Sequence, residues 1–381
     1  MKKIAIIILS EPLTYPPTIN AANILAENKW QVNIYGIKYN TTDNINCHKN
    51  VNINYVGSNV KGIRNVLQYF YFYLWIIGKL IVDRPKIIIS YDPLSVGPAI
   101  VSSWLFKIKW FYHVHDLIEN PKGWYKILKY IERKFVNKAY NISFPQIERA
   151  RIYKEEYNIK NEIDIVLNGP RKNWIKSSLP NLKVLEIKNK FDNIILYQGG
   201  ISKHFNLEPL LMAIDICKSN FAICIIGREL ETGVIDFYKS ILKTDKQKNR
   251  LFFLEPTSYD KLPSITSLAD IGLAKLTSNK KAPINDFYLI GASNKISEYC
   301  AFGLPILFPK TSINEFFLKN NNIGLMIDTS NYYDIAKKID LILLNHEIKN
   351  KMKSQSLEIF SNFLNFDFQF EKIRIKLEEV A

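Results

Sequence analysis

Short apolar runs alternate with longer amphipathic segments along the whole chain. Residues 3–9 are almost entirely apolar, residues 19–27 place Ile, Ala and Leu at helical spacing, and residues 31–35 have the pattern of a second strand. A buried run, an amphipathic helix and another strand make a βαβ unit with parallel strands. This opening stretch therefore predicts an α/β protein whose ligands bind at the carboxyl ends of its strands.

The same alternation continues to the C-terminus and restarts once near the middle. Further strands are expected at residues 52–56, 87–91, 110–114, 140–143, 163–167, 193–198, 222–226, 251–254, 271–276 and 306–308. Residues 171–190 are rich in Lys, Ser and Asn and contain Pro180, which is typical of a connecting segment. A chain of 381 residues also suits two domains. We expect these domains at residues 1–170 and 191–365, followed by a C-terminal helix at 366–381.

Composition indicates a folded protein of a reducing compartment. Hydrophobic residues make up 47% of the chain, with 15 Gly and 16 Pro, so disorder is not a main feature. The four cysteines are Cys47, Cys217, Cys224 and Cys300. They lie in or beside apolar segments without metal-ligand spacing, so we expect buried free thiols. The apolar run at the N-terminus is interrupted by Glu11 and Pro12 without a cleavage site, so we expect a strand rather than a signal peptide.

Positive charge is in excess, because 51 Lys and Arg against 36 Asp and Glu give a formal charge of +15. The excess implies attraction to phosphorylated ligands, to an anionic membrane surface or to nucleic acid. The cations are spread along predicted helices and no nucleic-acid-binding module occurs, so no nucleic-acid partner is expected. No apolar run reaches the roughly 18 to 20 residues that cross a bilayer. We expect a cytoplasmic protein that contacts the inner face of the plasma membrane peripherally.

Two helices that interleave aromatic and basic residues are candidates for this contact. Residues 63–82 are apolar on nearly every side, which favours a buried helix slightly over membrane contact. Residues 123–139 carry Trp124 and Tyr130 among several cations. The cations predicted to face the membrane are Lys126, Lys129, Arg133 and Lys134. A solvated helix face is an equal alternative, because charge runs on surface helices usually need no partner.

One helix start is the clearest candidate for ligand binding. From Ser293 the chain begins polar, continues with apolar side chains at helical spacing, and is stopped by a glycine and a proline. The first N–H groups of a helix have no internal partner, so with Asn294 and Lys295 beside them they suit a phosphate. Glu298, one turn later, is suited to accept hydrogen bonds from two adjacent sugar hydroxyls. On physical grounds alone, an ordinary capped surface helix is the alternative.

Glycines directly follow two strands of the second half. Gly199 and Gly200 stand between a predicted strand and a predicted helix, where the backbone can approach a diphosphate closely. Lys203 is a candidate counter-charge in the same loop. Gly227 ends the next strand in a similar turn. A pair of glycines is a weak signal by itself, so these residues support the helix start rather than replace it.

His113, His115 and Asp116 follow a strand of the first half. They therefore lie at the edge where a parallel sheet keeps its chemistry. A metal site is not favoured, because the chain has only five histidines and no further ligand clusters with these three.

Together these motifs resemble glycosyltransferase family 4. The helix start is similar to the family pattern NK-x-x-EY-x-A-x-G-x-P, and the run 112–119 resembles its hD-x-x-E stretch. The turn at 168–170 resembles the family's exit from its first domain, and the loop at Gly199 resembles its Y-x-G loop. The resemblance covers essentially the whole chain and is more specific in the second half.

The resemblance implies two Rossmann-like domains facing across a cleft, the GT-B fold, with the C-terminal helix packing back on the first domain. It implies a retaining glycosyltransferase that uses no metal and no other cofactor. The expected donor is a UDP- or GDP-linked sugar, and the expected acceptor is a glycan or a lipid-linked glycan. The composition, rich in Lys, Asn and Ile, hints at an AT-rich bacterium in which such enzymes build surface polysaccharide.

The family also implies roles for individual residues. His115 would lie at the donor sugar as a positioning or proton-handling group, with Asp116 as the second catalytic candidate. The loop of Glu255 and Pro256 would line the base pocket through its backbone. The expected diphosphate ligands are Asn294, Lys295, Lys203 and the backbone of Gly199 and Gly200, while Glu298 would bind the ribose.

Two departures from the family pattern leave alternatives open. An arginine is common in the Y-x-G loop, but Phe205 and its neighbours stand there, so Lys203 or His204 would have to supply the charge. The first acid of the family's E-x7-E pair is replaced by Ile290. These gaps are compatible with a catalytically silent partner subunit. A nucleotide-sugar epimerase on the same two-domain plan is the other alternative.

Overall fold

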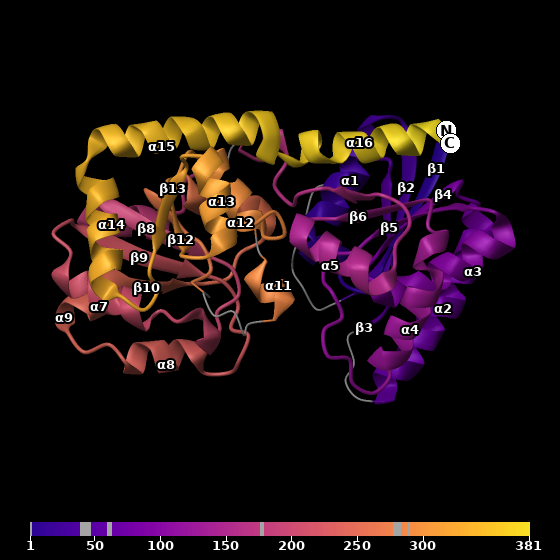
Figure 1. Ribbon diagram of the computed structural model, residues 1–381, viewed down its shortest axis with the longest axis horizontal. Helices are drawn as coiled ribbons and strands as arrows, with labels where there is room; N and C mark the ends of the chain where they lie inside the picture. The colour runs from indigo at the N-terminus through magenta and orange to yellow at the C-terminus, as the bar shows by residue number, and fades with distance from the viewer. Residues whose placement is uncertain (1, 39–46, 59–62, 176–178, 277–282, 289) are drawn as a thin grey trace. The chain divides into compact units, whose positions relative to one another are not determined.

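Figure 1 shows the computed structural model of the chain, which describes residues 2–38, 47–58, 63–175, 179–276, 283–288 and 290–381. The chain forms two compact units. Unit 1 comprises Met1–Asn168 and Phe366–Ala381, and unit 2 comprises Gly169–Asn365. All four cysteines are free, and three of them are buried. None of the described helices is both long and apolar enough to cross a membrane.

Unit 1 is built on a parallel sheet, described here with seven strands in the order β3-β2-β1-β4-β5-β6-β7. The strands are β1 (Lys2–Ile8), β2 (Trp30–Lys38), β3 (Val51–Ser58), β4 (Ile87–Tyr91), β5 (Lys109–His113), β6 (Asn141–Phe144) and β7 (Ile163–Ile165). The central strands are buried on both faces, which explains their unbroken apolar runs. The strand order reverses between β1 and β4, and ligands of such sheets bind at the carboxyl ends beside this reversal.

Helices cover both faces of the unit 1 sheet (Figure 1). One face packs against α2 (Ile63–Asp83), α3 (Val96–Phe106) and α5 (Ile147–Tyr157). The opposite face packs against α1 (Pro16–Glu27) and α16 (Phe366–Glu379). The C-terminal helix α16 therefore packs within unit 1. Within this unit α4 (Tyr125–Phe135) contacts α3.

Unit 2 repeats the plan with a parallel sheet, described here with six strands in the order β10-β9-β8-β11-β12-β13. The strands are β8 (Asn193–Gln198), β9 (Phe221–Ile226), β10 (Leu251–Leu254), β11 (Ile271–Leu273), β12 (Ile306–Pro309) and β13 (Gly324–Ile327). Their order reverses between β8 and β11, so the carboxyl ends of these strands are the expected ligand-binding edge.

Side-chain alternation along the strands divides the unit 2 helices between two faces. One face packs against α7 (Glu208–Ile216), α8 (Val234–Ser240), α14 (Tyr332–Leu344) and α15 (His346–Ile359). On the opposite face Tyr299 of α12 (Asn294–Ala301) lies directly on Gly272, where an added Cβ would be 2.4 Å from the ring. The remaining α-helices of the described part of the unit are α6 (Leu182–Lys190), α9 (Asp245–Arg250), α10 (Pro263–Thr266), α11 (Ile284–Phe287) and α13 (Ser312–Asn320).

The segment 171–190, predicted as a connector, contains the helix α6 within unit 2. Asn181 caps this helix, since its Oδ1 accepts a hydrogen bond of 3.1 Å from the backbone N–H of Val184. Only Val184 and Ile187 of the helix are buried. Because so few apolar side chains pack, the polar composition concealed the helix.

Helix α2 corrects the expectation of a helix buried on nearly every side. Tyr69, Phe72, Ile76 and Leu80 pack into the core of unit 1. The other face of the helix is solvent-exposed and equally apolar, and its exposed large side chains are Leu67, Phe70, Tyr71, Leu74, Ile81 and Val82. Hydrophobicity along the sequence does not distinguish these two faces, because both are apolar.

Candidate functional site

A cavity of about 510 Å³ lies at the carboxyl ends of β8 and β9, against the start of α12. Seven residues predicted for donor binding line it, namely Gly199, Gly200, Gly227, Pro256, Asn294, Lys295 and Glu298. These residues come from four separate stretches of the chain. The fold of unit 2 therefore brings most of the predicted binding residues to one place.

The two strand-end turns of the cavity touch through their backbones. Gly199 N–H donates a 2.8 Å hydrogen bond to the carbonyl of Ile226, and Gly199 has φ of +148°, which favours glycine. A Cβ at Gly227 would lie 1.7 Å from the Gly199 oxygen. A Cβ at Gly199 would lie 2.4 Å from Cε of Lys295. The positive φ requires glycine at Gly199 and the backbone contact requires it at Gly227, which leaves the backbone itself as the cavity wall.

Glu298 lies one turn into α12 and is 4% exposed. Nε2 of Gln198 donates a hydrogen bond to its Oε2, and Oε1 of Gln198 accepts a 3.0 Å hydrogen bond from Thr266. Burial raises the pKa of the Glu298 carboxyl to about 7, although Gln198 and Lys295 favour the ionised form. The carboxyl is thus held in a fixed position and titrates near neutral pH.

Lys295 supplies positive charge at the start of the same helix. Its Nζ lies 5.5 Å from the ring centroid of Tyr197, within cation–π range. Burial lowers the pKa of Lys295, and the nearby Glu298 opposes this shift. Oδ1 of the adjacent Asn294 is buried without a hydrogen-bond partner in the described structure, and Ser293 makes no side-chain cap to the helix. The first turn of α12 therefore offers a cation and helix N–H groups to an anion.

Two predicted residues are not brought to the cavity. Lys203 is exposed, and its Nζ lies 5.2 Å from the ring centroid of Phe237. Glu231 also accepts a 2.9 Å hydrogen bond from the Lys203 backbone, which fixes this turn. Glu255 is exposed, and only its neighbour Pro256 lines the cavity.

Eight lining residues were not predicted as ligands: Gln198, Ile226, Arg228, Leu230, Thr257, Leu262, Ala292 and Ser293. Arg228 is the most informative of them, because it adds a second cation beside Lys295. The signal in the sequence was its position directly after Gly227 at a strand end, where parallel sheets bind ligands. The arginine missing from the Phe205 loop thus has a counterpart in the neighbouring turn.

His115 and Asp116 lie in unit 1, in the turn after β5. Oδ1 of Asp92 accepts hydrogen bonds from the backbone N–H groups of His115 at 2.7 Å and of Asp116 at 3.4 Å. Tyr15 donates a third hydrogen bond, of 3.3 Å, to Oδ2. Burial and the nearby Asp116 raise the pKa of Asp92 to about 7. Asp92, with φ of +62°, was not predicted, and it fixes the turn that carries both candidates.

The imidazole of His115 is half-buried and held from two sides. Its Nε2 lies 3.0 Å from Nδ2 of Asn168, and its ring meets Tyr15 edge-on at 4.7 Å between centroids. Burial, with Arg149 nearby, lowers the pKa of His115 to about 3, so the ring is neutral at physiological pH. With Nε2 accepting from Asn168, Nδ1 carries the hydrogen. Nδ1 is buried and has no hydrogen-bond partner in the part of the chain that is described.

Asp116 is exposed and forms an ion pair with a buried arginine. Nη1 of Arg149 lies 2.9 Å from Oδ1 of Asp116 and 2.9 Å from the backbone oxygen of His115. Arg149 therefore holds the same turn as Asp92, through the Asp116 side chain and the His115 carbonyl. In the described residues, no group of three or more His, Cys, Asp and Glu side chains is arranged to hold a metal ion.

Comparisons with known proteins agree with this architecture. Residues 181–358, which include the cavity and α12, match the family described as Glycosyl transferases group 1. No curated protein matches the sequence. Sucrose-phosphate synthase from Thermosynechococcus elongatus superimposes with a TM-score of 0.76 at 13% identity, over 100% of both chains.

Two further solved structures are similar in fold. HepE from Anabaena, solved in complex with UDP, has a TM-score of 0.70 at 13% identity over 100% of both chains. A structure described as a putative UDP-N-acetylglucosamine 2-epimerase from Listeria monocytogenes has a TM-score of 0.63 at 12% identity, over 99% of this chain and 96% of that chain. At these low sequence identities the solved structures show only that the fold is similar. The classification of the protein therefore rests on the family match of residues 181–358.

The two parallel sheets, with α16 packed on unit 1, define a GT-B fold. The family match identifies the second unit as a glycosyl transferases group 1 domain, and the chain is therefore a glycosyltransferase.

Proposed function

We propose that the protein transfers a sugar from a nucleotide-activated donor, UDP- or GDP-linked, to a glycan or lipid-linked acceptor in bacterial surface polysaccharide synthesis. Retention of anomeric configuration belongs to the proposal, by resemblance to family 4. The observation that carries it is the cavity at α12, in which a buried carboxyl and two cations surround a helix N-terminus. This combination suits a ligand with neighbouring hydroxyls and a diphosphate.

The proposed donor pose follows from the charges of the cavity. The diphosphate lies at the first turn of α12, between Lys295, Arg228 and the backbone of Gly199. Glu298 accepts hydrogen bonds from two ribose hydroxyls, since Gln198 holds its carboxylate in place. Negative charge develops on the departing diphosphate during transfer, and the helix N-terminus with its cations stabilises this charge without a metal. HepE, whose fold is similar, was solved with UDP, which makes UDP the first nucleotide to test.

His115 is proposed to position the donor sugar. A neutral imidazole whose Nδ1 carries the hydrogen is a hydrogen-bond donor rather than a base. The structure therefore favours the positioning role over the proton-handling role. Asp116 is proposed to keep His115 in place through Arg149, because that ion pair also holds the His115 carbonyl.

A thermal-shift panel tests the donor proposal directly. UDP, GDP, ADP and CMP are added separately, and the correct nucleotide raises the melting temperature most, because a ligand at 100 times its dissociation constant adds about 2.7 kcal/mol of stability. The matching nucleotide sugars are then incubated with a glycan acceptor. Formation of a glycosylated product with release of nucleoside diphosphate supports the proposal, whereas no shift with any nucleotide contradicts it.

The same experiment separates the two alternatives. An epimerase, suggested by the fold of the Listeria protein, would convert a UDP-sugar into its epimer without any acceptor. A silent subunit would bind nucleotide weakly or not at all and form no product. Arg228 argues against a catalytically silent subunit, because it supplies a cation to the cavity in place of the arginine that the Phe205 loop lacks.

Donor affinity is expected to fall as the pH falls through 7. The Glu298 carboxyl has a pKa of about 7, and only its ionised form accepts hydrogen bonds through both oxygens. Below pH 7 the affinity should therefore drop by up to roughly tenfold per pH unit. Titration with a nucleotide sugar avoids the terminal phosphate of a free diphosphate, which titrates in the same range. Glu298→Gln should bind the donor more weakly at pH 8, and its affinity should not change with pH. If the affinity of Glu298→Gln still falls with pH as it does in wild type, the Glu298 carboxyl is not the titrating group.

The membrane part of the proposal is modified by the structure. On α4, Lys126, Arg133 and Lys134 are exposed, as is Tyr130. Lys129 instead forms a 2.6 Å ion pair with Glu156 and donates a 3.0 Å hydrogen bond to a backbone carbonyl. Three of the four predicted cations therefore form the proposed basic face, which would contact an anionic leaflet.

A further inference from the structure

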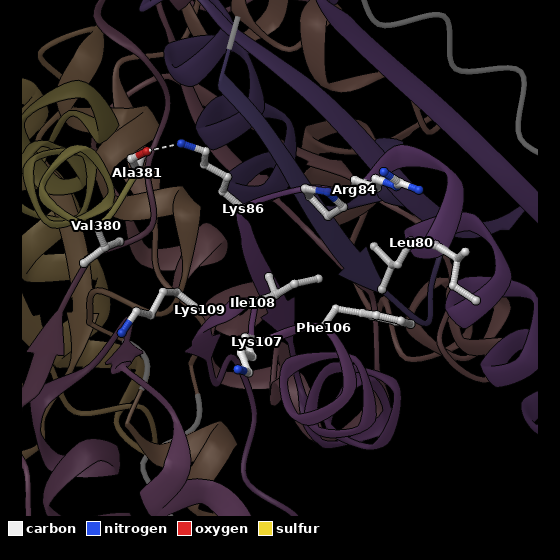
Figure 2. A pocket seen from close by; sticks show the side chains of 11 residues that line it. Leu80, Arg84, Lys86, Phe106, Lys107, Ile108, Lys109, Val380 and Ala381 are labelled. Atoms are coloured by element: carbon white, nitrogen blue, oxygen red, sulfur yellow. Dashed lines mark hydrogen bonds between the residues drawn. The ribbon is translucent and has the colours of Figure 1, made fainter.

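Unit 1 contains a second cavity, of about 600 Å³, at the edge of the sheet where β4 and β5 begin (Figure 2). The segments before these two strands form its base, and the end of the chain after α16 forms one side. His115 follows the other end of β5, and five residues of strand separate the two edges by roughly 16 Å. This amino-edge cavity is thus distinct from the His115 turn.

Four cationic side chains and no acidic side chain line the amino-edge cavity in the described residues. The cations are Arg84, Lys86, Lys107 and Lys109. Arg84 and Lys107 follow the C-termini of α2 and α3, whose partial negative charge favours one cation each. Lys86 directly precedes β4 and Lys109 is the first residue of β5, so neither follows a helix C-terminus. Lys86 Nζ donates a 2.7 Å hydrogen bond to the backbone oxygen of Ala381, as Figure 2 shows, which partly compensates its charge. The four cations outnumber these partial negative charges, so excess positive charge remains at the opening.

The walls between these cations are apolar. Leu80, Ile81, Phe106 and Ile108 line the same cavity. Ile81 is 50% exposed and Phe106 is 38% exposed, so the apolar wall continues onto the outer surface. A ligand that fills this cavity therefore has an anionic group attached to an apolar body.

The apolar wall extends along the exposed face of α2 that was described above. Leu67, Leu74 and Val82 are 66, 72 and 75% exposed, and Trp104 on the neighbouring α3 is 79% exposed. Helix α2 has 21 residues and is roughly 31 Å long. It runs from the amino-edge cavity back toward the sheet edge that carries His115. Figure 1 shows α2, α3 and α4 together on this face of unit 1.

We infer that the amino-edge cavity binds the phosphate of an anionic phospholipid, with the acyl chains against the exposed face of α2 and α3. The charge of the cavity favours an anion, because the described lining contains four cationic side chains and no acidic side chain. The adjoining surface presents large aliphatic and aromatic side chains, which suit the headgroup and upper acyl region of a bilayer. The described residues of this α2 face include no exposed acid, unlike the mixed rim of a typical protein interface.

This inference deepens the peripheral-membrane part of the proposed function and rests on it. It adds a phosphate-binding cavity to the basic face of α4 and places the outer side of α2 along the lipid surface. In that position the edge that carries His115 lies at one end of the bound helix, where a lipid-linked acceptor would be held in the same surface.

Vesicle partitioning of the full chain tests the inference. The anionic probe is a vesicle of phosphatidylcholine with about 30% phosphatidylglycerol. This fraction of anionic lipid approximates an anionic leaflet. Arg84→Glu with Lys107→Glu should lower the partition coefficient by about tenfold or more. Lys49→Glu with Lys160→Glu, two exposed lysines elsewhere on unit 1, makes the same change in net charge and should lower it by less than about twofold. Equal losses in both double variants would overturn the inference.

A third double variant separates this inference from the α4 proposal. If Lys126→Glu with Lys134→Glu abolishes binding while the cavity variant binds normally, the membrane contact belongs to α4 and the cavity inference is wrong. If wild type does not bind anionic vesicles at all, both fail. Nucleotide binding in unit 2, measured on the same samples, should be unchanged in every variant, so a failure of the donor proposal is seen separately.

Competition identifies the source of the phosphate. Short-chain phosphatidylglycerol, soluble below its micelle concentration, should displace wild type from the vesicles, and equal inorganic phosphate should not. Equal displacement by inorganic phosphate would mean a free-anion site and overturn the lipid assignment. Leu74→Ser should weaken vesicle binding without changing the mass in solution. A wild-type dimer that Leu74→Ser dissociates would assign the α2 face to a second copy of the chain instead.

Discussion

Replacing His115 with alanine is expected to lower turnover by about two to three orders of magnitude, the loss typical of removing one hydrogen-bond donor at a reacting centre. The donor dissociation constant should change by less than about threefold, because the proposed nucleotide ligands all lie in unit 2. Turnover is followed as release of nucleoside diphosphate from the donor, and affinity by titration with the donor alone.

Two further variants sharpen this test. His48→Ala, at the start of β3, removes an imidazole from the same unit and should leave turnover unchanged. Asn168→Ala removes the group beside Nε2 and should cause a smaller loss than His115→Ala, since the ring stays but is less fixed. If turnover of His115→Ala survives within a few-fold, His115 has only a structural role.

Replacing Glu132 with alanine is expected to destabilise unit 1 by about 3 to 5 kcal/mol. Glu132 of α4 is 1% exposed and accepts hydrogen bonds from three tyrosine hydroxyls. The donors are Tyr112 at 2.6 Å, Tyr153 at 2.8 Å and Tyr157 at 2.9 Å. Removing the carboxylate leaves buried hydroxyls without their acceptor and opens a small void, and each effect costs free energy.

Urea denaturation followed by circular dichroism measures this loss as a change in the free energy of unfolding. Glu132→Gln keeps one acceptor oxygen and should lose less than Glu132→Ala. Glu156→Ala is the matched control, because Glu156 is largely exposed in its ion pair with Lys129 and should cost less than about 1 kcal/mol. A loss at Glu132→Ala no larger than that of the control would contradict the importance of the tyrosine cluster.

Most strands of both units were predictable from the sequence, because parallel strands buried on both faces leave unbroken apolar runs. β1 and β4 show this in unit 1, and β8 and β9 show it in unit 2. The order of the strands in the two sheets was not predicted, and neither was the short strand β13. Helix α6 was not accessible, because only two of its side chains are buried. The exposed face of α2 was also missed, since an apolar surface face and an apolar core face look alike in one dimension.

The start of α12 and its glycine turns were predictable because their chemistry is local. A helix N-terminus, a neighbouring lysine and a glycine at a strand end all appear within a few residues. Asp92 was missed because its partner His115 lies 23 residues away. The Glu132 cluster likewise joins residues 20 to 25 positions apart. Lys129 was predicted to face a membrane, but the acid that pairs with it comes from the next helix.

The central claim is that the cavity at α12 is the donor site, and calorimetric titration of wild type and Glu298→Ala with the selected nucleotide tests it most directly. Wild type should bind one equivalent. Glu298→Ala should bind about 10 to 150 times more weakly at pH 8. The variant lacks the charged hydrogen bond between the carboxylate and the ribose, which contributes about 1.5 to 3 kcal/mol to binding. Glu255→Ala is the control, since Glu255 is exposed and does not line the cavity, and it should match wild type. Equal affinity in wild type and Glu298→Ala, both folded, would place the donor elsewhere and contradict the account.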